Sequence, residues 1–422
     1  MAVLRFRSAA LLAATSFFIV ASAFAADPQA AQPTTAPSAT AYRTDGGDAS
    51  LPWFQLQAGE FPPPNSAHHI AGELIAVDHV NRTGMIRPDR TDDQRRGEWD
   101  IARPFTMLPF GTIRYRGAPA ELRDIPLGTH LHGEFFADPL VSKTAPATFS
   151  RVFRFEDDFS YSQRRSKLWR VVDMQLGPPK PGQPGAPSSS STTVQSVAAQ
   201  AAAALAGVGI LTLVEVDAKG APSLSTEAAT NAAKPLLFQV NAATRVWKGR
   251  GFGALADVTA GANVIVNLTV CTLKGPGRVT DIWLDDESRS LVAAQQNEIH
   301  RQYTREHGFA CQVEHVDNQA GIVTAVLFAG FDPKLLASFK PDETTTCAVA
   351  EDNLRTWDQI NDRKMGQVLE VLQSPPTPGF SGVRVKFQPV NLLEGFRPKR
   401  YVRLFAPGWR CDDLPREERL YQ

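Results

Sequence analysis

The chain has 422 residues, in which 44 lysine and arginine residues are balanced by 44 aspartate and glutamate residues. Its length fits two or three domains of about 100 to 200 residues each. Proteins that bind nucleic acids electrostatically usually carry a basic excess. This chain lacks one, so its composition argues against that class of function.

The first 25 residues have the pattern of a secretory signal peptide. Arg5 and Arg7 precede an apolar run that ends in Ala-Phe-Ala at residues 23–25, which is the order of a charged region, an apolar core and a small-residue cleavage site. An uncleaved membrane anchor is the alternative, but a spanning helix needs about 20 apolar residues and this run is short for one. We expect cleavage after Ala25 and an exported protein, soluble in the periplasm, cell envelope or medium.

Two stretches are rich in Pro, Ala, Thr and Ser and poor in large apolar side chains, so they bury too little to offset the entropy of ordering. The first, residues 26–60, predicts a flexible leader. The second, residues 176–206, predicts a linker between an N-terminal unit and a longer C-terminal part. Elsewhere, short runs with alternating apolar and β-branched residues, punctuated by Gly, Pro and Asp, predict an all-β protein.

One segment, residues 287–308, predicts a helix. Val292, Ile299 and Tyr303 can share one of its faces, and Gly308 can act as its C-terminal stop. We expect this helix to join the last two units of the chain.

The cysteines lie in the C-terminal part of the chain, and none belongs to a CxxC pair. They are Cys271, Cys311, Cys347 and Cys411. In an exported protein an even number of cysteines predicts disulfides, whereas a zinc site would need closer spacing. Four cysteines allow three connectivities, of which we favour the one that pairs Cys347 with Cys411.

An internal repeat begins each unit with an apolar strand that ends in a Val-Asp step and is followed by a glycine. The three sets are Val77, Asp78 and Gly84, then Val216, Asp217 and Gly220, then Val316, Asp317 and Gly321. Aspartate can cap a short turn through its side chain and glycine supplies a positive φ, so each step predicts a hairpin.

A second match occurs later in the first two units and is loose in the third. It aligns Leu122, Asp124 and Gly128 with Leu255, Asp257 and Gly261. Repeats at a spacing of about 100 residues are tandem domains rather than the turns of a solenoid.

The repeat, together with ATRVWKG at residues 243–249, resembles small five- or six-stranded OB-like barrels of unknown function that occur in tandem in exported bacterial proteins. The resemblance is closest over residues 207–285, fair over 66–137 and loose over 309–410. Its motifs belong to strands and turns, so it carries over no catalytic residue. It implies an envelope protein of a class that binds oligosaccharides, nucleic acids or proteins on one barrel face and its loops.

We therefore expect an all-β chain of two or three tandem small OB-like barrels with flexible linkers and one connecting helix. Its parts in order are a signal peptide at 1–25, a leader at 26–60, barrel 1 at 61–175, a linker at 176–206, barrel 2 at 207–286, a helix at 287–308 and barrel 3 at 309–422.

The segment GTHLHGEFF poses the sharpest functional question. In a strand the side chains alternate, so Leu131 and Phe135 are expected on the core face, and His130, His132 and Glu134 on the other. Two imidazoles and a carboxylate on one face could hold zinc or another divalent transition metal. The histidines that could approach from a neighbouring strand are His68, His69 and His79.

The second unit argues for a strand that needs no metal. The repeat places Asn263, Ile265 and Asn267 at the positions of His130, His132 and Glu134, and these are not a ligand set. Such a strand can form without an ion, so we favour a metal-free strand and expect no cofactor.

A long insertion, residues 87–117, mixes arginines with aromatic residues, a combination that suits stacking on sugars or bases or a protein hot spot. The residues expected to form a binding surface are Arg95, Arg96, Trp99, Arg103, Phe110, Arg114 and Tyr115. Residues 159–170 could extend it. The alternative is a loop folded over the barrel, with its arginines paired to nearby carboxylates.

Known catalytic and nucleotide motifs are missing from the sequence. The chain has no GxSxG, HExxH or P-loop lysine motif, and the glycines at 249, 251 and 253 are followed by a β-type repeat rather than a helix, which predicts an inter-strand loop. We expect a non-catalytic protein that binds an envelope protein or a cell-wall glycan through barrel loops. The alternatives are a metal-binding protein or metalloenzyme centred on His130 and His132, and single-stranded nucleic-acid binding.

Overall fold

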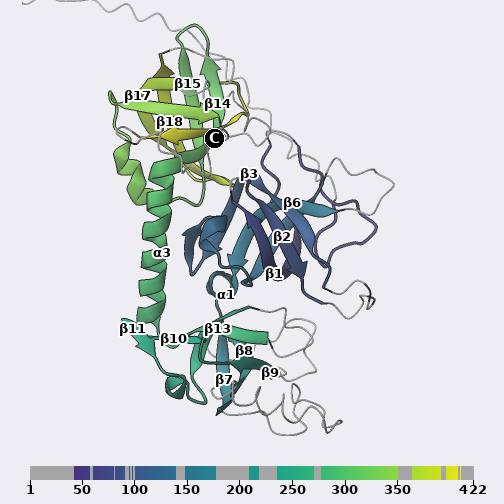
Figure 1. The fold of residues 1–422 in the computed structure, drawn as a ribbon. Coiled ribbons are helices and arrows are strands. Elements are labelled where there is room, and N and C mark those ends of the chain that lie inside the picture. The colour runs from purple at the N-terminus through teal and green to yellow at the C-terminus, as the bar shows by residue number, and fades with distance from the viewer. Residues whose placement is uncertain are drawn as a thin grey trace, which may run out of the picture. The chain divides into compact units, whose positions relative to one another are not determined.

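The computed structural model describes residues 42–57, 60–79, 81–90, 95, 97, 100–138, 148–176, 209–217, 235–269, 277–349, 364–390, 396–406 and 409. Strands dominate these residues and form three successive closed barrels, here barrels 1, 2 and 3, which confirms the tandem-barrel prediction (Figure 1). None of the described helices combines the length and the apolar composition needed to cross a membrane.

Barrel 1 is a five-stranded barrel of the OB type. Its strands are β1 (His68–Asp78), β2 (Thr83–Pro88), β3 (Arg103–Tyr115), β5 (His130–Ala137) and β6 (Phe149–Asp157). They follow one another as β2-β1-β5-β6-β3, and β2 pairs with β3 to close the barrel. The β3–β6 pair is parallel and the other pairs are antiparallel. A short strand, β4 (Ala118–Ala120), forms a hairpin with the end of β3.

A bulge in β3 changes which way its side chains face. Between Met107 and Thr112 the register against β6 shifts by several residues. Met107 and Ile113 face the core of barrel 1, whereas Phe110 joins a separate aromatic cluster. Bulges re-aim side chains in this way because the extra residues are left out of the ladder.

Barrel 2 repeats the strand order of barrel 1. Its strands are β7 (Lys167–Leu176), β8 (Gly209–Asp217), β9 (Leu236–Val240), β12 (Asn263–Leu268) and β13 (Gly277–Trp283), with a hairpin of β10 (Arg245–Lys248) and β11 (Gly251–Gly253). Here β9 pairs in parallel with β13, and β12 returns to β7. The second repeat match is confirmed, because Gly128 precedes β5 and Gly261 precedes β12, with φ of 89° and 86°.

The boundary between the first two barrels differs from the prediction. β7 precedes the stretch expected to be a linker, yet it pairs with β8 beyond that stretch and with β12. Residues 177–208 lie outside the described residues, but they connect two strands of one barrel. A long insertion inside a hairpin costs little, because loop-closure entropy grows only slowly with length. Val216 and Asp217 therefore end the second strand of barrel 2, not the first as the repeat had implied.

Cleavage of the connection should leave the two fragments associated. Cleavage at a protease site inserted within residues 177–208 would produce an N-terminal fragment that ends after β7 and a C-terminal fragment that contains β8 and β12. In the barrel β7 is paired with both of these strands. We expect both fragments to elute together in size-exclusion chromatography after complete cleavage. Separate elution in native buffer would show that β7 does not belong to barrel 2.

Barrel 3 closes differently from the other two. Its strands are β14 (Phe309–Asp317), β15 (Ile322–Phe328), β16 (Thr344–Val349), β17 (Lys364–Gln373), β18 (Phe380–Pro389) and β19 (Tyr401–Phe405). They close in the order β14-β15-β18-β17-β16-β19, and each of these pairs is antiparallel. The lack of a parallel pair among these strands distinguishes it from the OB order of barrels 1 and 2, in keeping with its looser repeat.

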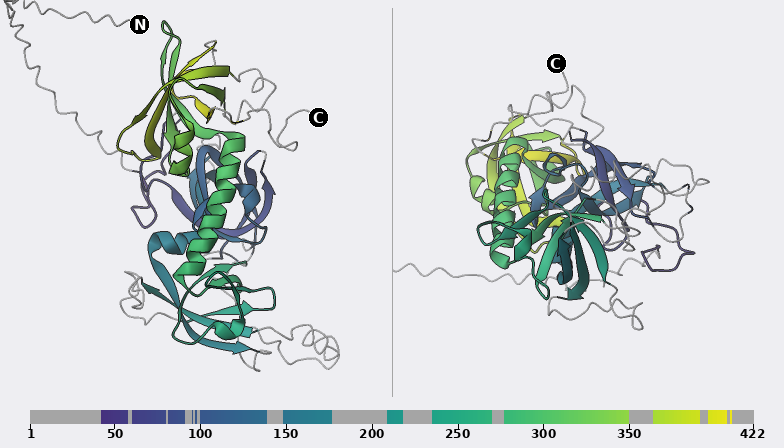
Figure 2. Two further views of the ribbon diagram at one scale, coloured as in Figure 1. Left: turned by 90° about the vertical axis from the view of Figure 1, so that its left-hand side faces the viewer. Right: turned by 60° about the horizontal axis from the view of Figure 1, so that its bottom comes forward.

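The predicted helix is α3 (Asp286–His307), which connects β13 to β14 and ends at Gly308 as expected. Figure 2 shows it as one unbroken helix. Val292 is buried, but Ile299 is 48% exposed. The buried stripe runs instead through polar side chains such as Gln296 and His300 at a spacing of four residues. An apolar pattern could not reveal a face of this kind.

The leader is ordered from residue 42 where the structure describes it. The Trp53 ring lies 4.8 Å from the ring of His68 and 5.1 Å from that of Phe149, and Phe54 packs against Phe136 of β5. These two aromatic anchors, Trp53 and Phe54, supply apolar burial that the composition of the leader had suggested was missing. The prediction of a flexible leader is therefore wrong for this part, and residues 26–41 lie outside the described residues.

Candidate functional site

The predicted two faces of β5 are confirmed. Leu131 and Phe135 are 0% and 1% exposed and belong to the core of barrel 1. His130 and His132 lie on the opposite face. That face is not open to solvent at His130, which is only 4% exposed.

The group that covers the histidines comes from the helix that follows β6. α1 (Asp158–Arg165) begins directly after the strand, because Asp157 caps it by accepting a hydrogen bond from the backbone N–H of Ser160 at 2.9 Å. The next residue, Asp158, then lies in the first turn. β6 pairs with β5, so this turn is placed against the histidine face.

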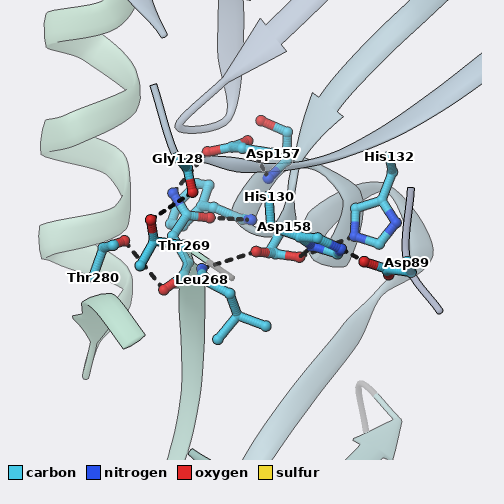
Figure 3. Close-up of polar contacts among 12 residues, drawn as sticks. Asp89, Gly128, His130, His132, Asp157, Asp158, Leu268, Thr269 and Thr280 are labelled. Atoms are coloured by element: carbon cyan, nitrogen blue, oxygen red, sulfur yellow. Dashed lines mark hydrogen bonds and ion pairs between the residues drawn. The ribbon is translucent and has the colours of Figure 1, made fainter. Parts of the chain in front are cut away.

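The resulting cluster contains two imidazoles and two carboxylates (Figure 3). His130 Nδ1 lies 2.7 Å from Asp158 Oδ1, and His130 Nε2 lies 3.0 Å from Asp89 Oδ2. His132 Nε2 reaches the same Asp158 oxygen at 3.0 Å. The His132 ring also stacks on Tyr161 of α1, with centroids 3.8 Å apart.

Barrel 2 contributes backbone and amide groups to the same place. The N–H of Leu268 donates to Asp158 Oδ2 at 2.9 Å. Asn267 accepts from the N–H of Phe159 at 2.8 Å and donates to Asp157 at 2.9 Å. Asn267 is 2% exposed. It is the counterpart of Glu134 in the repeat, and through these hydrogen bonds it joins β12 to α1.

Electrostatics favour charged forms of the central pair. Burial alone would lower the pKa of His130, but the charge of Asp158 and the hydrogen bonds to Asp158 and Asp89 hold that pKa well above its ordinary value. Burial would raise the pKa of Asp158, but His130 and His132 hold it well below its usual range. Without a bound ion, the geometry is that of an imidazolium between two carboxylates.

The neighbouring histidine is neutral at physiological pH. Burial, together with the nearby His132, lowers the pKa of His69 to about 4. Its ring centroid lies 5.7 Å from that of His132. His68 pairs with Asp45 at 2.5 Å, and His79 directly follows β1, which ends at Asp78.

The candidate metal-ligand set, which the sequence offered as the alternative to a metal-free strand, differs in the structure at one position. His130, His132 and Asp158 offer ligand atoms that all lie within 4.8 Å of one another. Glu134 is not among them, because it pairs with Arg154 at 3.2 Å and lies 4.0 Å from Arg164. Its place is taken by Asp158, which sequence reasoning missed. The only local signal, an Asp-Asp step with Ser160 before a polar segment, indicates a helix start rather than a ligand.

The expected arginine–aromatic surface is not assembled from the predicted residues. Phe110 and Tyr115 are 5% and 4% exposed, and Tyr115 belongs to the core of barrel 1. Arg114 donates to the Gly117 carbonyl at 2.6 Å. Arg103 is exposed at the start of β3, and Arg95 is exposed before it. Arg96 and Trp99 lie outside the described residues. The reason is that residues 103–115 are a barrel strand, not a loop.

A groove of the anticipated chemistry lies instead over β6 and the end of α1. It has a volume of about 680 Å³. We call it the arginine–aromatic groove, and its defining residues are Phe61, Phe136, Phe153, Arg154, Arg164 and Arg165. The segment 159–170, considered only as an extension of the expected surface, thus contributes two of its three arginines.

The cysteine predictions are tested at one position. Cys311 is a free thiol, fully buried in the core of barrel 3, where burial raises the pKa of its thiol far above the ordinary value. The disulfide expectation is therefore wrong for Cys311. Cys271 and Cys411 lie outside the described residues, and only the backbone of Cys347 is described, in β16. The preferred pairing stays a prediction.

The glycine-rich segment at 249–253 is a hairpin between β10 and β11, which confirms the inter-strand loop. Gly249 adopts a φ of 55° in the turn.

Comparisons with known proteins name no family for this chain. No protein-family model matches its sequence, and no curated protein or solved structure matches it either.

Proposed function

We propose that the protein is an exported, non-catalytic binding protein of the cell envelope, which holds an acidic segment of a partner protein in the arginine–aromatic groove. The observation that carries this proposal is the groove itself, which is lined by three arginines and three phenylalanines. Arginine and aromatic side chains are the residues that dominate binding energy at protein interfaces.

The charges of the groove favour an acidic occupant. Arg164 donates to Glu156 at 2.9 and 2.7 Å, and Arg154 pairs with Glu134 at 3.2 Å. Arg165 is exposed and lies over the Tyr161 ring at 5.4 Å. Among the described residues it has no carboxylate partner. A carboxylate of the ligand can therefore pair with Arg165 without breaking an existing ion pair.

The floor of the groove is formed by packed aromatic rings. Phe136 is 2% exposed, and the ring of Phe61, which directly follows the leader, lies 5.3 Å from the Phe153 ring of β6. Preformed aromatic surface lowers the ordering cost of binding. Residues 61–64, which directly follow the leader, thus belong to the proposed binding surface.

The proposal is tested by charge reversal combined with cross-linking in the native envelope. Arg165→Glu should reduce the yield of the captured partner about tenfold or more, because like charges across an interface cost well over 1.4 kcal/mol, which is tenfold in affinity. Arg278→Glu is the matched control, since Arg278 is an exposed arginine on β13 of barrel 2. Mass spectrometry of the captured species distinguishes a protein from a cell-wall glycan. Equal capture by both variants would refute the groove as the site.

A further inference from the structure

The His–Asp cluster has the donor set of a transition-metal site, and this feature is independent of the groove. Two imidazoles and one carboxylate, as in His130, His132 and Asp158, suit zinc and other divalent transition metals. Asp158 Oδ1 lies 2.7 Å from His130 Nδ1 and 3.0 Å from His132 Nε2. Around a tetrahedral zinc with bonds of about 2.0 to 2.1 Å, neighbouring ligand atoms lie about 3.3 Å apart. A small opening of the cluster would admit the ion.

The groups around these three residues are those that support metal ligands. His130 can bind through Nδ1 while Nε2–H donates to Asp89 at 3.0 Å. Asp158 can bind through Oδ1 while Oδ2 accepts from the backbone of Leu268 at 2.9 Å. Such outer hydrogen bonds fix the tautomer and orientation of ligating histidines and carboxylates.

Buried nitrogen atoms without partners give a second, independent sign. His132 Nδ1 and His69 Nε2 are both buried and have no hydrogen-bond partner among the described residues. An unpartnered buried polar atom is costly, and here two of them lie beside the cluster. Rotation of the His132 ring, or a water held between the rings, can use them when an ion is present.

Charge also favours a cation at this position. Carboxylate oxygens of Asp89 and Asp158 lie 2.7 to 3.0 Å from imidazole nitrogens of the cluster, so a divalent ion bound here would face two carboxylates. The side chain of His132 is 16% exposed, compared with 5% for His130, so an ion can enter from the side of His132.

We infer that His130, His132 and Asp158 bind one divalent transition-metal ion, which joins β5 to α1 and, through Leu268, to barrel 2. Three protein ligands leave a fourth position for water. Its ligands come from two elements, β5 and α1, and Asp158 also accepts a hydrogen bond from Leu268 of barrel 2, so the bound ion connects elements that meet at the junction of the two barrels.

The test uses the full mature chain without a histidine tag, stripped with chelator and titrated with Zn²⁺ by calorimetry. We expect one equivalent of zinc bound, with a rise in the thermal midpoint. His132→Ala should abolish both, and His132 is chosen because it makes a single hydrogen bond to the cluster. Asp89→Ala should weaken zinc binding about 10- to 100-fold, as expected for an outer hydrogen-bond partner.

Two control variants separate this site from adventitious binding. His315→Ala removes an exposed histidine of barrel 3 and should leave the stoichiometry at one. Glu134→Gln should also retain the ion, because Glu134 pairs with arginines instead. Failure to bind zinc, or zinc retained by His132→Ala, would overturn the inference. Neither result would bear on Arg165-dependent capture, so this test and that of the proposed function fail separately.

Discussion

Replacing Asp158 with asparagine should lower the free energy of unfolding of chelator-treated protein by about 3–5 kcal/mol, the cost of removing one partner from a buried ion pair. Asp158 is 7% exposed and accepts hydrogen bonds from His130, His132 and the backbone of Leu268. The amide removes the negative charge while it keeps the size. His130 then retains its buried charge with only Asp89 opposite, so the folded state alone is penalised.

Urea unfolding measures this effect, with Asp286→Asn as the matched control. Asp286 has a side chain that is 95% exposed and pairs with Arg289 across one helical turn, so its replacement should change the free energy by less than about 0.5 kcal/mol. A loss below about 1 kcal/mol for Asp158→Asn would mean that the cluster does not hold α1 against β5.

Replacing Arg82 with methionine should cost about 3 kcal/mol, because hydrogen bonds from charged groups contribute about 1.5–3 kcal/mol each and are not additive. Arg82 is 8% exposed. Its guanidinium donates to the carbonyl oxygens of Leu108, Pro109 and Gly111 at 3.1, 3.1 and 2.8 Å. These carbonyls belong to the bulge of β3, and methionine would leave them buried without this donor.

The expected loss at Arg82 is measured in the same urea experiment, with Arg278→Met as the control for loss of an exposed arginine. Because the bulge directs Phe110 into the aromatic cluster that includes Phe61, tryptic cleavage after Arg43 of the leader should also become faster. Unchanged stability and unchanged cleavage would show that the bulge does not depend on Arg82.

The sequence predicts those features of the fold that depend on residues close together in the chain. Alternation in β5 separated Leu131 and Phe135 from the histidines, and a glycine stop predicted the end of α3. Both follow from neighbours within one element. The strand order of barrels 1 and 2 also agrees with the resemblance that the turn motifs suggested.

Long-range pairing could not be read in the same way. The serine-rich stretch after β7 predicts a domain boundary there, but β7 pairs with β8 and β12, which lie far along the chain. Asp158 approaches His132 only because β6 pairs with β5 and a helix cap starts α1 at that point. The sequence predicts Phe110 on the surface because no nearby residue indicates the bulge that directs it into the aromatic cluster.

The arginine–aromatic groove as the binding site is tested most directly by a photoreactive amino acid placed on its rim. Pro64 is exposed and lines the groove, and Arg278 on barrel 2 serves as the distant position. In the native envelope we expect a cross-linked adduct from position 64 that disappears in the Arg165→Glu background, and none from position 278. Absence of an adduct at position 64, or the same adduct from both positions, would contradict the proposed function.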